Sequence, residues 1–469
     1  MTATTHRAGP GEGEVSTVAE KGLQVPTAPD KLPLIGHVLP LLRGPLRFLE
    51  SLPQHGDLVQ VRIGGLRAVI VCDPELTHEV LVHDRVYDKG GALYDRLREV
   101  LGNGVATCPY SEHRRQRRQI QPVFRQERFP DYARAMAREI AVQIGMWNDV
   151  QTFDALTAAL SITSRVAVKT MFSAPLSPSV VDDIVNDLNT AMAFMYKRLL
   201  VPPMLRSLPV LRKRTYDRAR TRLRETTDRI IAEYQERGVD YGDLLATLLK
   251  AQNQDSQIEF EKGRGGLSDE EIGDQVVTFM LGGIEANANT IAWALHTIAR
   301  DPALQNRLHV EADTVLAGAL PQFSDIPRLD LTGRTVHETL RLYSIGWFFT
   351  RTATEPARLG DYRIPAGTTV VYSPYLIQRR EDLYHDAGRF DPDRWTGDGT
   401  ITAQSKAFVP FGAGARKCIG DTFAVVQATL TLAMIMSAWQ IEPATSAPLR
   451  PKLGTQLSPN GGPLRIRAR

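Results

Sequence analysis

The chain has 469 residues, of which 43% are hydrophobic and 23% are charged, and its formal net charge is only +3. These values are typical of a globular protein with a sizeable core, and they argue against a nucleic-acid-binding protein, for which a strong basic excess is expected. Cys72, Cys108 and Cys418 are too few for a disulfide framework or for the four ligands of an iron–sulfur cluster, so we expect a reducing, cytoplasmic location.

The beginning of the chain is polar and Gly-rich, and it lacks the apolar segment of a signal peptide. We therefore expect a disordered tail at residues 1–25, followed by a single domain over residues 26–469. Alternating apolar and polar residues on both sides of Gly64 and Gly65 predict a β-hairpin within residues 56–74.

Helical periodicity predicts helices at residues 74–87 and 112–126, with a Gly-rich irregular segment between them. Residues 130–300 are almost entirely of helical pattern, whereas short β-type runs follow Ser344. The expected fold class is therefore mainly α, with a small β region contributed by both ends of the chain.

The stretch from Ile419 to Trp439 is long and apolar enough to suggest a membrane span. It contains Asp421, Gln427 and several threonines, which favours a buried core helix instead. We expect no membrane span.

The segment FGAGARKCIG lies directly before this apolar helix. Gly412 and Gly414 fit a tight turn, and Cys418 lies next to a helix N-terminus, where backbone N–H groups and the helix dipole favour a thiolate. Phe411 can shield the sulfur from water, and Arg416 can reach an anion. Two other interpretations are a buried structural cysteine and a phosphate loop, but the spacing of a phosphate loop is absent.

The same segment matches F-x-x-G-x-R-x-C-x-G and thereby resembles the haem-binding loop of the cytochrome P450 family. The resemblance implies a single-domain helical prism that encloses haem b, with Cys418 as the thiolate ligand of the iron. It implies cofactor contacts from five residues of this loop: Phe411, Gly414, Arg416, Cys418 and Gly420.

Glu338 and Arg341 are three residues apart and so share one face of a helix, which alone would be a commonplace surface pair. In the family, an E-x-x-R pair precedes the cysteine loop, and Arg394 in FDPDRW is similar to the third member of a Glu-Arg-Arg cluster. By resemblance, this cluster is structural and supports the haem from below.

Five basic residues occur within EHRRQRRQ, which could be a solvated face or a nucleic-acid patch. His113 and Arg117 share a helical face, and a partly buried haem needs positive charge beside its two propionates. The segment resembles the family's H-x-x-x-R helix, and Arg351 and Arg416 match its other propionate contacts. The remaining arginines would face an acidic electron donor: Arg114, Arg115 and Arg118.

The segment GGIEANANT resembles the oxygen-binding helix of the family, A-G-x-E-T-T-A-N-T. Glu285 keeps the acid of an acid–alcohol pair, but Ala286 replaces the alcohol and cannot form a hydrogen bond. Three routes for protons remain: the side chain of Asn287, a polar group of the substrate, and a water beside Glu285, which we favour. Glu285 could also be a merely structural acid.

By resemblance, the substrate pocket consists of mostly apolar residues, which predict an apolar guest: Leu93, Val105, Met192, Met195, Gly282, Ile345 and Phe348. The sequence looks like that of bacterial, soluble family members that oxidise terpenes. This implies a monomeric monooxygenase that uses O2 to hydroxylate a sesquiterpene, in one or several oxidations, in antibiotic biosynthesis.

The electron source is expected to be a ferredoxin with its reductase, because the chain has no G-x-G-x-x-G fingerprint. Two alternatives stay open: a haem-thiolate peroxygenase or isomerase, and a haem-based sensor or carrier.

Overall fold

The computed structural model describes residues 23–171, 177–200, 213–237, 243–254, 266–396 and 406–469. The predicted tail, residues 1–25, lies almost entirely outside the described residues. Leu23, however, already pairs with the chain near Tyr362, since its N–H donates to the carbonyl of Asp361 at 2.9 Å. Regular contacts thus begin before the predicted boundary at residue 26.

Helices form most of the described chain, as predicted. In chain order they are α1 (Val38–Arg43), α2 (Pro45–Ser51), α3 (Pro74–Val82), α4 (Gly91–Leu101), α5 (Tyr110–Ile120), α6 (Phe129–Ile144), α7 (Ala155–Met171), α8 (Pro178–Leu200), α9 (Lys213–Arg237), α10 (Leu244–Gln254), α11 (Asp269–Met280), the π-helical segment η6 (Leu281–Ala286), α12 (Asn287–Ile298), α13 (Pro302–Leu316), α14 (Asp330–Tyr343), α15 (Pro374–Ile377) and α17 (Asp421–Ala438).

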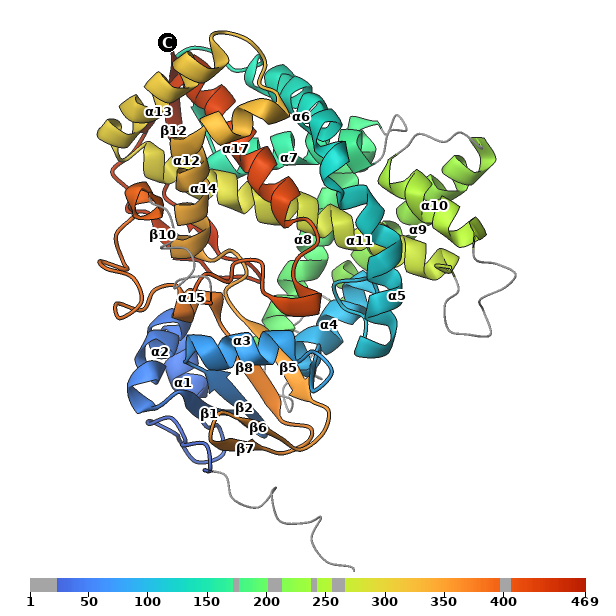
Figure 1. The fold of residues 1–469 in the computed structure, drawn as a ribbon, viewed down its shortest axis with the longest axis vertical. Coiled ribbons are helices and arrows are strands. Elements are labelled where there is room, and N and C mark those ends of the chain that lie inside the picture. Colours follow the sequence, from blue (N-terminus) through green and yellow to red (C-terminus); the bar gives the residue numbers. More distant parts are fainter. Residues whose placement is uncertain (1–22, 172–176, 201–212, 238–242, 255–265, 397–405) are drawn as a thin grey trace, which may run out of the picture.

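The largest sheet is five-stranded, with the strand order β1-β2-β8-β5-β3. It joins both ends of the chain, as predicted: β1 (Leu58–Ile63), β2 (Leu66–Val71), β3 (Tyr87–Asp88), β5 (Phe349–Ala353) and β8 (Thr369–Tyr372). The predicted hairpin is confirmed, because β1 and β2 pair antiparallel on either side of Gly64 and Gly65. Figure 1 shows this sheet at one end of the molecule, beside α1 to α3, with the long helices above it.

Smaller sheets complete the β region. They consist of β4 (Thr152–Phe153), β12 (Leu464–Ala468) and β9 (Trp439–Pro443), of β6 (Ala357–Leu359) with β7 (Tyr362–Ile364), and of β10 (Arg450–Lys452) with β11 (Ser458–Asn460).

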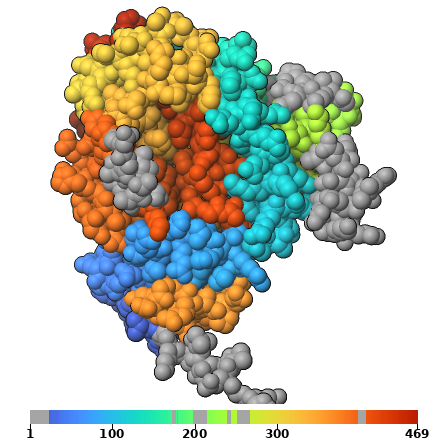
Figure 2. Space-filling view, viewed as in Figure 1, coloured from blue at the N-terminus to red at the C-terminus, as the bar shows by residue number. Residues whose placement is uncertain are grey.

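The core lies among α6, α7, α12 and α17. Every residue of α12 is buried, and α17 is buried over most of its length, so both helices are surrounded by protein on nearly all sides. Within the described residues, α17 alone is long and apolar enough to cross a membrane, but it packs in the interior, as predicted for a core helix. In Figure 2 the C-terminal segment, in orange and red, occupies the centre of the visible face between the other layers.

The prediction of an irregular segment between residues 87 and 112 is wrong, because α4 forms there. The glycines stand at the ends of this helix and not within it: Gly90 precedes it and Gly102 follows it with a φ of 62°. A Cβ at Gly102 would lie 2.1 Å from the carboxylate of Asp274 on α11. Gly102 therefore ends α4 and allows a close approach to α11.

Candidate cofactor and active site

The cysteine loop precedes α17 and packs against the end of α3. The N–H of Cys418 donates to the carbonyl of Phe411 at 2.9 Å, which closes the loop. Gly412 and Gly414 have φ angles of 69° and 67°. A Cβ at Gly414 would lie only 2.5 Å from the carbonyl oxygen of Leu81. The loop therefore requires glycine at position 414 for both conformation and space.

The Cys418 side chain is accessible, although many protein atoms surround it. Burial raises the pKa of the Cys418 thiol above its ordinary value. The N–H of Gly420 and the charges of Lys89 and Arg117 act in the opposite direction. The predicted support from the helix N-terminus is thus present but smaller than the effect of burial. A metal cation on the sulfur would supply the remaining stabilisation of a thiolate.

Basic side chains from distant parts of the sequence meet next to this loop. Burial, Arg416, Lys89, Arg117 and Arg351 together lower the pKa of His113 on α5 to about 2. The pKa of Lys89 lies well below its ordinary value, because Lys89 is buried and faces Arg351 and Arg416. The structure therefore brings together the four predicted propionate-binding residues, together with Lys89, which the sequence interpretation missed.

The charge of Arg416 is already balanced by acidic neighbours. Its guanidinium lies 2.6 Å from Asp88 and 3.3 Å from Asp84, and it donates to the carbonyl of Cys108 at 2.9 Å. Within the described residues, Arg416 therefore anchors the loop to the segment after α3, while its Nε forms no hydrogen bond.

Among the described residues, Arg351 and Lys89 have only neutral acceptors. Arg351 is buried on β5, and its Nη1 donates to the hydroxyl of Tyr94 and to the carbonyl of Thr350, while its Nε has no partner in the part of the chain that the structure describes. The Nζ of Lys89 donates to the carbonyl of Ala106 at 2.8 Å.

Buried cations without a counter-charge are costly. The Nδ1 of His113 is also buried and has no partner among the described residues. An anionic group beside these side chains would satisfy both the charges and the open hydrogen bonds, so the residues fit the two propionates of a haem.

The oxygen-binding helix is interrupted by the π-helical segment η6, between α11 and α12. Such segments occur frequently at functional sites. A Cβ at Gly283 would lie 2.9 Å from the Cε of Met171, so this glycine allows close packing against α7. A Cβ at Gly282 would contact nothing within 4 Å, and Gly282 is exposed. Gly282 thus faces open space, as expected for a residue that lines a pocket.

Glu285 lies in η6, and its Oε2 is buried without a hydrogen-bond partner in the described ranges of the chain. Burial raises the pKa of Glu285 to about 7, so the carboxyl group can hold or release a proton near neutral pH. Its neighbour Ala286 is only partly buried. Asn287 differs, because its Nδ2 donates to the Oε1 of Gln427 on α17 at 2.6 Å in the core. The amide of Asn287 is therefore engaged away from the proposed proton route.

Five of the predicted pocket residues are buried in the large apolar core of the molecule: Leu93, Val105, Met192, Met195 and Ile345. Phe348, Ala286 and the η6 residue Ile284 belong to or pack against the same core. That these residues line one substrate pocket stays a prediction.

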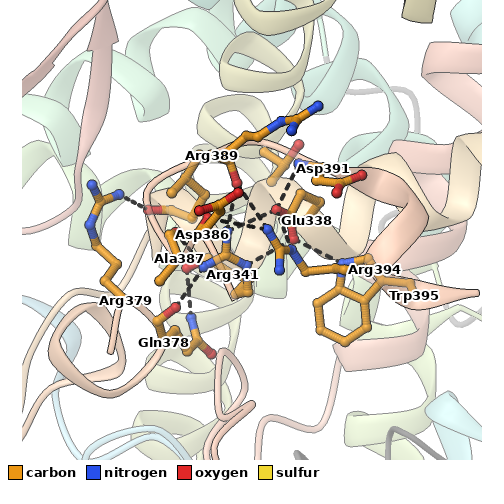
Figure 3. Close-up of polar contacts among 12 residues, drawn as sticks. Glu338, Arg341, Gln378, Arg379, Asp386, Ala387, Arg389, Asp391, Arg394 and Trp395 are labelled. Atoms are coloured by element: carbon orange, nitrogen blue, oxygen red, sulfur yellow. Dashed lines mark hydrogen bonds and ion pairs between the residues drawn. The ribbon is translucent and has the colours of Figure 1, made fainter. Parts of the chain in front are cut away.

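Glu338, Arg341 and Arg394 also meet, as Figure 3 shows. Glu338 and Arg341 are fully buried and form two hydrogen bonds of 2.8 Å, and the Nε of Arg394 donates to Glu338 at 2.9 Å. The remaining donors of Arg341 bond to three carbonyl groups, at Gln378, Ala387 and Arg389. All five N–H groups of Arg341 are thus paired.

The expectation that Arg114, Arg115 and Arg118 all face solvent is wrong for Arg115. Arg114 and Arg118 are exposed. Arg115 instead forms an ion pair with Glu271, at the first turn of α11, and donates to the carbonyl of Gly266. The helical spacing of α5 directs Arg115 toward α11, and this could not be inferred without knowing which helix packs there.

The missed residues Lys89 and Tyr94 flank the first turn of α4. The sequence does contain a sign of Lys89: this basic residue precedes a Gly-Gly pair, and glycines permit another group to approach the backbone closely. The prediction of an irregular segment hides this sign. Arg351 donates to the Tyr94 hydroxyl and lies near Lys89, but it is more than 250 residues away in the sequence, so only the fold reveals the cluster.

Comparison with known proteins agrees with this geometry. The model of the cytochrome P450 family matches residues 26–463. Pentalenene oxygenase from Streptomyces avermitilis is 40% identical, over 94% of this chain and 97% of its own length. Cyclooctatin synthase from Streptomyces melanosporofaciens is also 40% identical, over 94% of both chains. Cyclooctat-9-en-7-ol 5-monooxygenase from the same organism is 40% identical, over 90% of this chain and 91% of its own length. The chain therefore belongs to the cytochrome P450 family, whose members bind haem through a cysteine thiolate.

Proposed function

We propose that this P450 monooxygenase inserts one oxygen atom into an unactivated C–H bond of an apolar terpene, and that Cys418 is the ligand of its haem iron. One observation carries the proposal: Cys418 is accessible beside a group of cations, of which Lys89 and Arg351 have no acidic partner among the described residues. A haem with a thiolate ligand supplies oxygen activation, because the sulfur donates electron density that favours O–O cleavage.

The protein's own groups then have separate roles. Lys89, His113, Arg117 and Arg351 would bind the propionates, while Gly414 keeps the loop close to α3 and Arg416 anchors it. Glu338, Arg341 and Arg394 would fix the segment before the cysteine loop and take no part in the reaction.

Glu285 would deliver protons through a water molecule, since Ala286 carries no hydroxyl group. A carboxyl group that titrates near pH 7 is suited to repeated proton transfer at neutral pH. The engagement of Asn287 with Gln427 supports the water route over a route through Asn287.

The substrate would be a cyclic terpene, and a sesquiterpene such as pentalenene is the candidate that we test first. The apolar cluster around Leu93, Met192 and Ile345 favours such a guest. The names of the three relatives describe oxidation of terpene skeletons, which supports the same class. Successive oxidation of one methyl carbon within antibiotic biosynthesis belongs to this proposal.

Electrons would come from a ferredoxin and its reductase in the cytoplasm. Arg114 and Arg118 are exposed on α5, close to Arg117, whose Nη1 donates to the carbonyl of Lys417 at 2.5 Å. Exposed positive charge next to the cysteine loop suits an acidic donor protein.

The test is the absorption spectrum of the reduced protein with carbon monoxide, followed by titration with pentalenene. We expect the red-shifted Soret band of the family, its loss in Cys418→Ala, and its retention in Cys108→Ala and Cys72→Ala. Pentalenene should cause a spectral shift and be hydroxylated with NADPH, ferredoxin and reductase. Retention of the band in Cys418→Ala would refute the ligand assignment, whereas absence of any terpene-induced shift would refute the substrate class.

A second candidate rests on Ala286. A peroxygenase or isomerase needs no reductant-driven proton delivery, so the missing hydroxyl would matter less there. Product formation with hydrogen peroxide but not with NADPH and ferredoxin would favour it. A sensor or carrier would show neither product nor steady NADPH consumption.

A further inference from the structure

The loop between β10 and β11, residues 453–457, is half-buried and packs next to α12, which continues the oxygen-binding helix. The side chains of Leu453 and Leu457 pack in an apolar cluster with Trp347 and with Tyr196 of α8. Three hydrogen bonds of 3.0 Å fix the loop: from the N–H of Leu457 to the carbonyl of Ile345, from the Nε1 of Trp293 to the carbonyl of Leu457, and from the Nε1 of Trp347 to the carbonyl of Gly454.

Gln456 lies between the hydrogen-bonded residues Gly454 and Leu457, and its side chain is bonded to α12. The Nδ2 of Asn289 donates to the Oε1 of Gln456 at 3.2 Å and to the backbone carbonyl of Glu285 at 3.0 Å. A carbonyl can only accept, so the bond to Glu285 fixes which end of the Asn289 amide faces it. Gln456 must then present its oxygen to Asn289, which directs its amide nitrogen away from the Asn289 amide.

The Nε2 of Gln456 is therefore a donor of fixed direction. It has no hydrogen-bond partner within the part of the chain that the structure describes, and it is not a buried orphan atom, because Gln456 is partly exposed. Its surroundings are the η6 segment, through Asn289 and Glu285, and the Ile345 to Phe348 segment, through the loop bonds. Both belong to the proposed substrate pocket.

We propose that Gln456 determines specificity by donating a hydrogen bond to an oxygen atom of the substrate, so that the enzyme prefers a terpene that already carries a hydroxyl or carbonyl group. This inference rests on the proposed function. A single donor in an apolar pocket selects an oxygenated guest over the hydrocarbon, because leaving the donor unpaired in the complex is unfavourable. The reaction that supplies such a substrate would be an earlier oxidation of the same skeleton.

The experiment measures dissociation constants from substrate-induced spectral shifts for two matched pairs of probes. One pair is cyclooctat-9-en-7-ol and the hydrocarbon that lacks its hydroxyl, and the other is pentalenene and its derivative with one hydroxylated methyl group. The variants are Gln456→Met, which keeps the shape but removes the donor, and Gln456→Leu as a second truncation. Thr455→Ala is the control, since the Thr455 side chain makes no hydrogen bond among the described residues.

With at least one skeleton, we expect the alcohol to bind the wild-type protein about 5- to 10-fold more tightly than its hydrocarbon. Gln456→Met and Gln456→Leu should abolish this preference without changing the affinity for the hydrocarbon, and Thr455→Ala should retain it. The hydrocarbon affinity of each variant reports on its fold.

Equal affinities of the wild-type protein for an alcohol and its hydrocarbon, or a preference that survives in Gln456→Met, would overturn the role of Gln456 and leave the proposed function intact. If none of the four probes causes a shift in protein with a normal carbon monoxide spectrum, the terpene function fails, and this inference fails with it.

Discussion

Asn287 of α12 and Gln427 of α17 join two core helices through a buried hydrogen bond. The Nδ2 of Asn287 donates to the Oε1 of Gln427 at 2.6 Å. The Nε2 of Gln427 has no partner of its own, so this bond is the one polar anchor of the Gln427 side chain among the described residues. Asn287 is therefore a structural link between the oxygen-binding helix and the helix that follows Cys418.

Replacing Asn287 by alanine should destabilise the protein by about 1–3 kcal/mol, because the whole Gln427 amide would be left buried and unpaired. The free energy of unfolding, measured by urea denaturation, checks this value. The fraction of NADPH converted to product should remain near that of the wild type. A collapse of that fraction at unchanged stability would restore Asn287 as a proton donor.

Replacing Glu285 by glutamine should slow turnover by about 10- to 100-fold while the carbon monoxide spectrum stays normal, since the amide cannot transfer the proton. In the wild type, the pKa of about 7 means that the carboxyl group is protonated below neutral pH and ionised above it. Turnover that depends on the protonated form should fall as pH rises through 7, and the variant should lose this dependence. An identical pH profile in both proteins would contradict the role of Glu285.

The same shift predicts the pH dependence of stability. The folded state binds more protons than the unfolded state between the ordinary carboxyl pKa of 4.5 and about 7, so the contribution of Glu285 to stability is lost as pH rises through this window. Denaturation curves at pH 5 and pH 8 should show a smaller difference for Glu285→Gln than for the wild type. A difference that is unchanged in the variant would show that Glu285 is ionised in the folded protein at both pH values.

The two glycines of the cysteine loop provide a matched pair of variants. Both have positive φ, but a Cβ at Gly412 would meet no atom closer than 3.9 Å, whereas a Cβ at Gly414 would clash with backbone atoms of Leu81 and Val82. Gly412→Ala should cost about 1 kcal/mol and retain haem. Gly414→Ala should lose most of its haem, measured as Soret absorbance per protein. Equal haem content in both variants would mean that the contact with α3 is unimportant.

Local features of the sequence predicted those parts of the fold that depend on local chemistry. The Gly64-Gly65 hairpin follows from the alternation of apolar and polar residues, and the core helix α17 from its apolar composition, whereas α4 is not predicted because the glycines that cap it resemble those of a loop. The π-helical segment could not be predicted, because the packing of Gly283 on Met171 involves a distant helix. The role of Lys89 could not be predicted either, because the residues around it come from β5 and the cysteine loop, which are distant in the sequence.

Removing Arg341 tests how far the buried Glu338 cluster supports the fold. Arg341→Ala should destabilise the protein by about 3–5 kcal/mol, because the fully buried Glu338 carboxylate would lose one of the two cations that balance its charge. Arg307→Ala removes an ion pair with Asp393 in which both side chains are about half exposed, and it should cost at most about 1 kcal/mol. Urea denaturation of both variants checks the difference. Similar losses would show that burial does not determine the importance of these ion pairs.

The cation cluster makes a final prediction about cofactor affinity. Arg351→Met and Lys89→Met should each fold at least as well as the wild type without haem, because each removes a charge that has no acidic partner in the described part of the chain. With haem bound, the variants should be less stable than the wild type, because the propionates would lose a cation. Haem should dissociate from the variants about 10-fold faster or more. Haem transfer to an excess of apomyoglobin measures this rate, and thermal melting of the haem-free proteins measures the stability.

Arg416→Met is the contrasting variant, because it leaves Asp84 and Asp88 without their partner and should destabilise the haem-free protein as well. Variants of Arg351 and Lys89 that melt at lower temperature without haem, and retain haem as the wild type does, would show that these side chains serve the fold and not the cofactor.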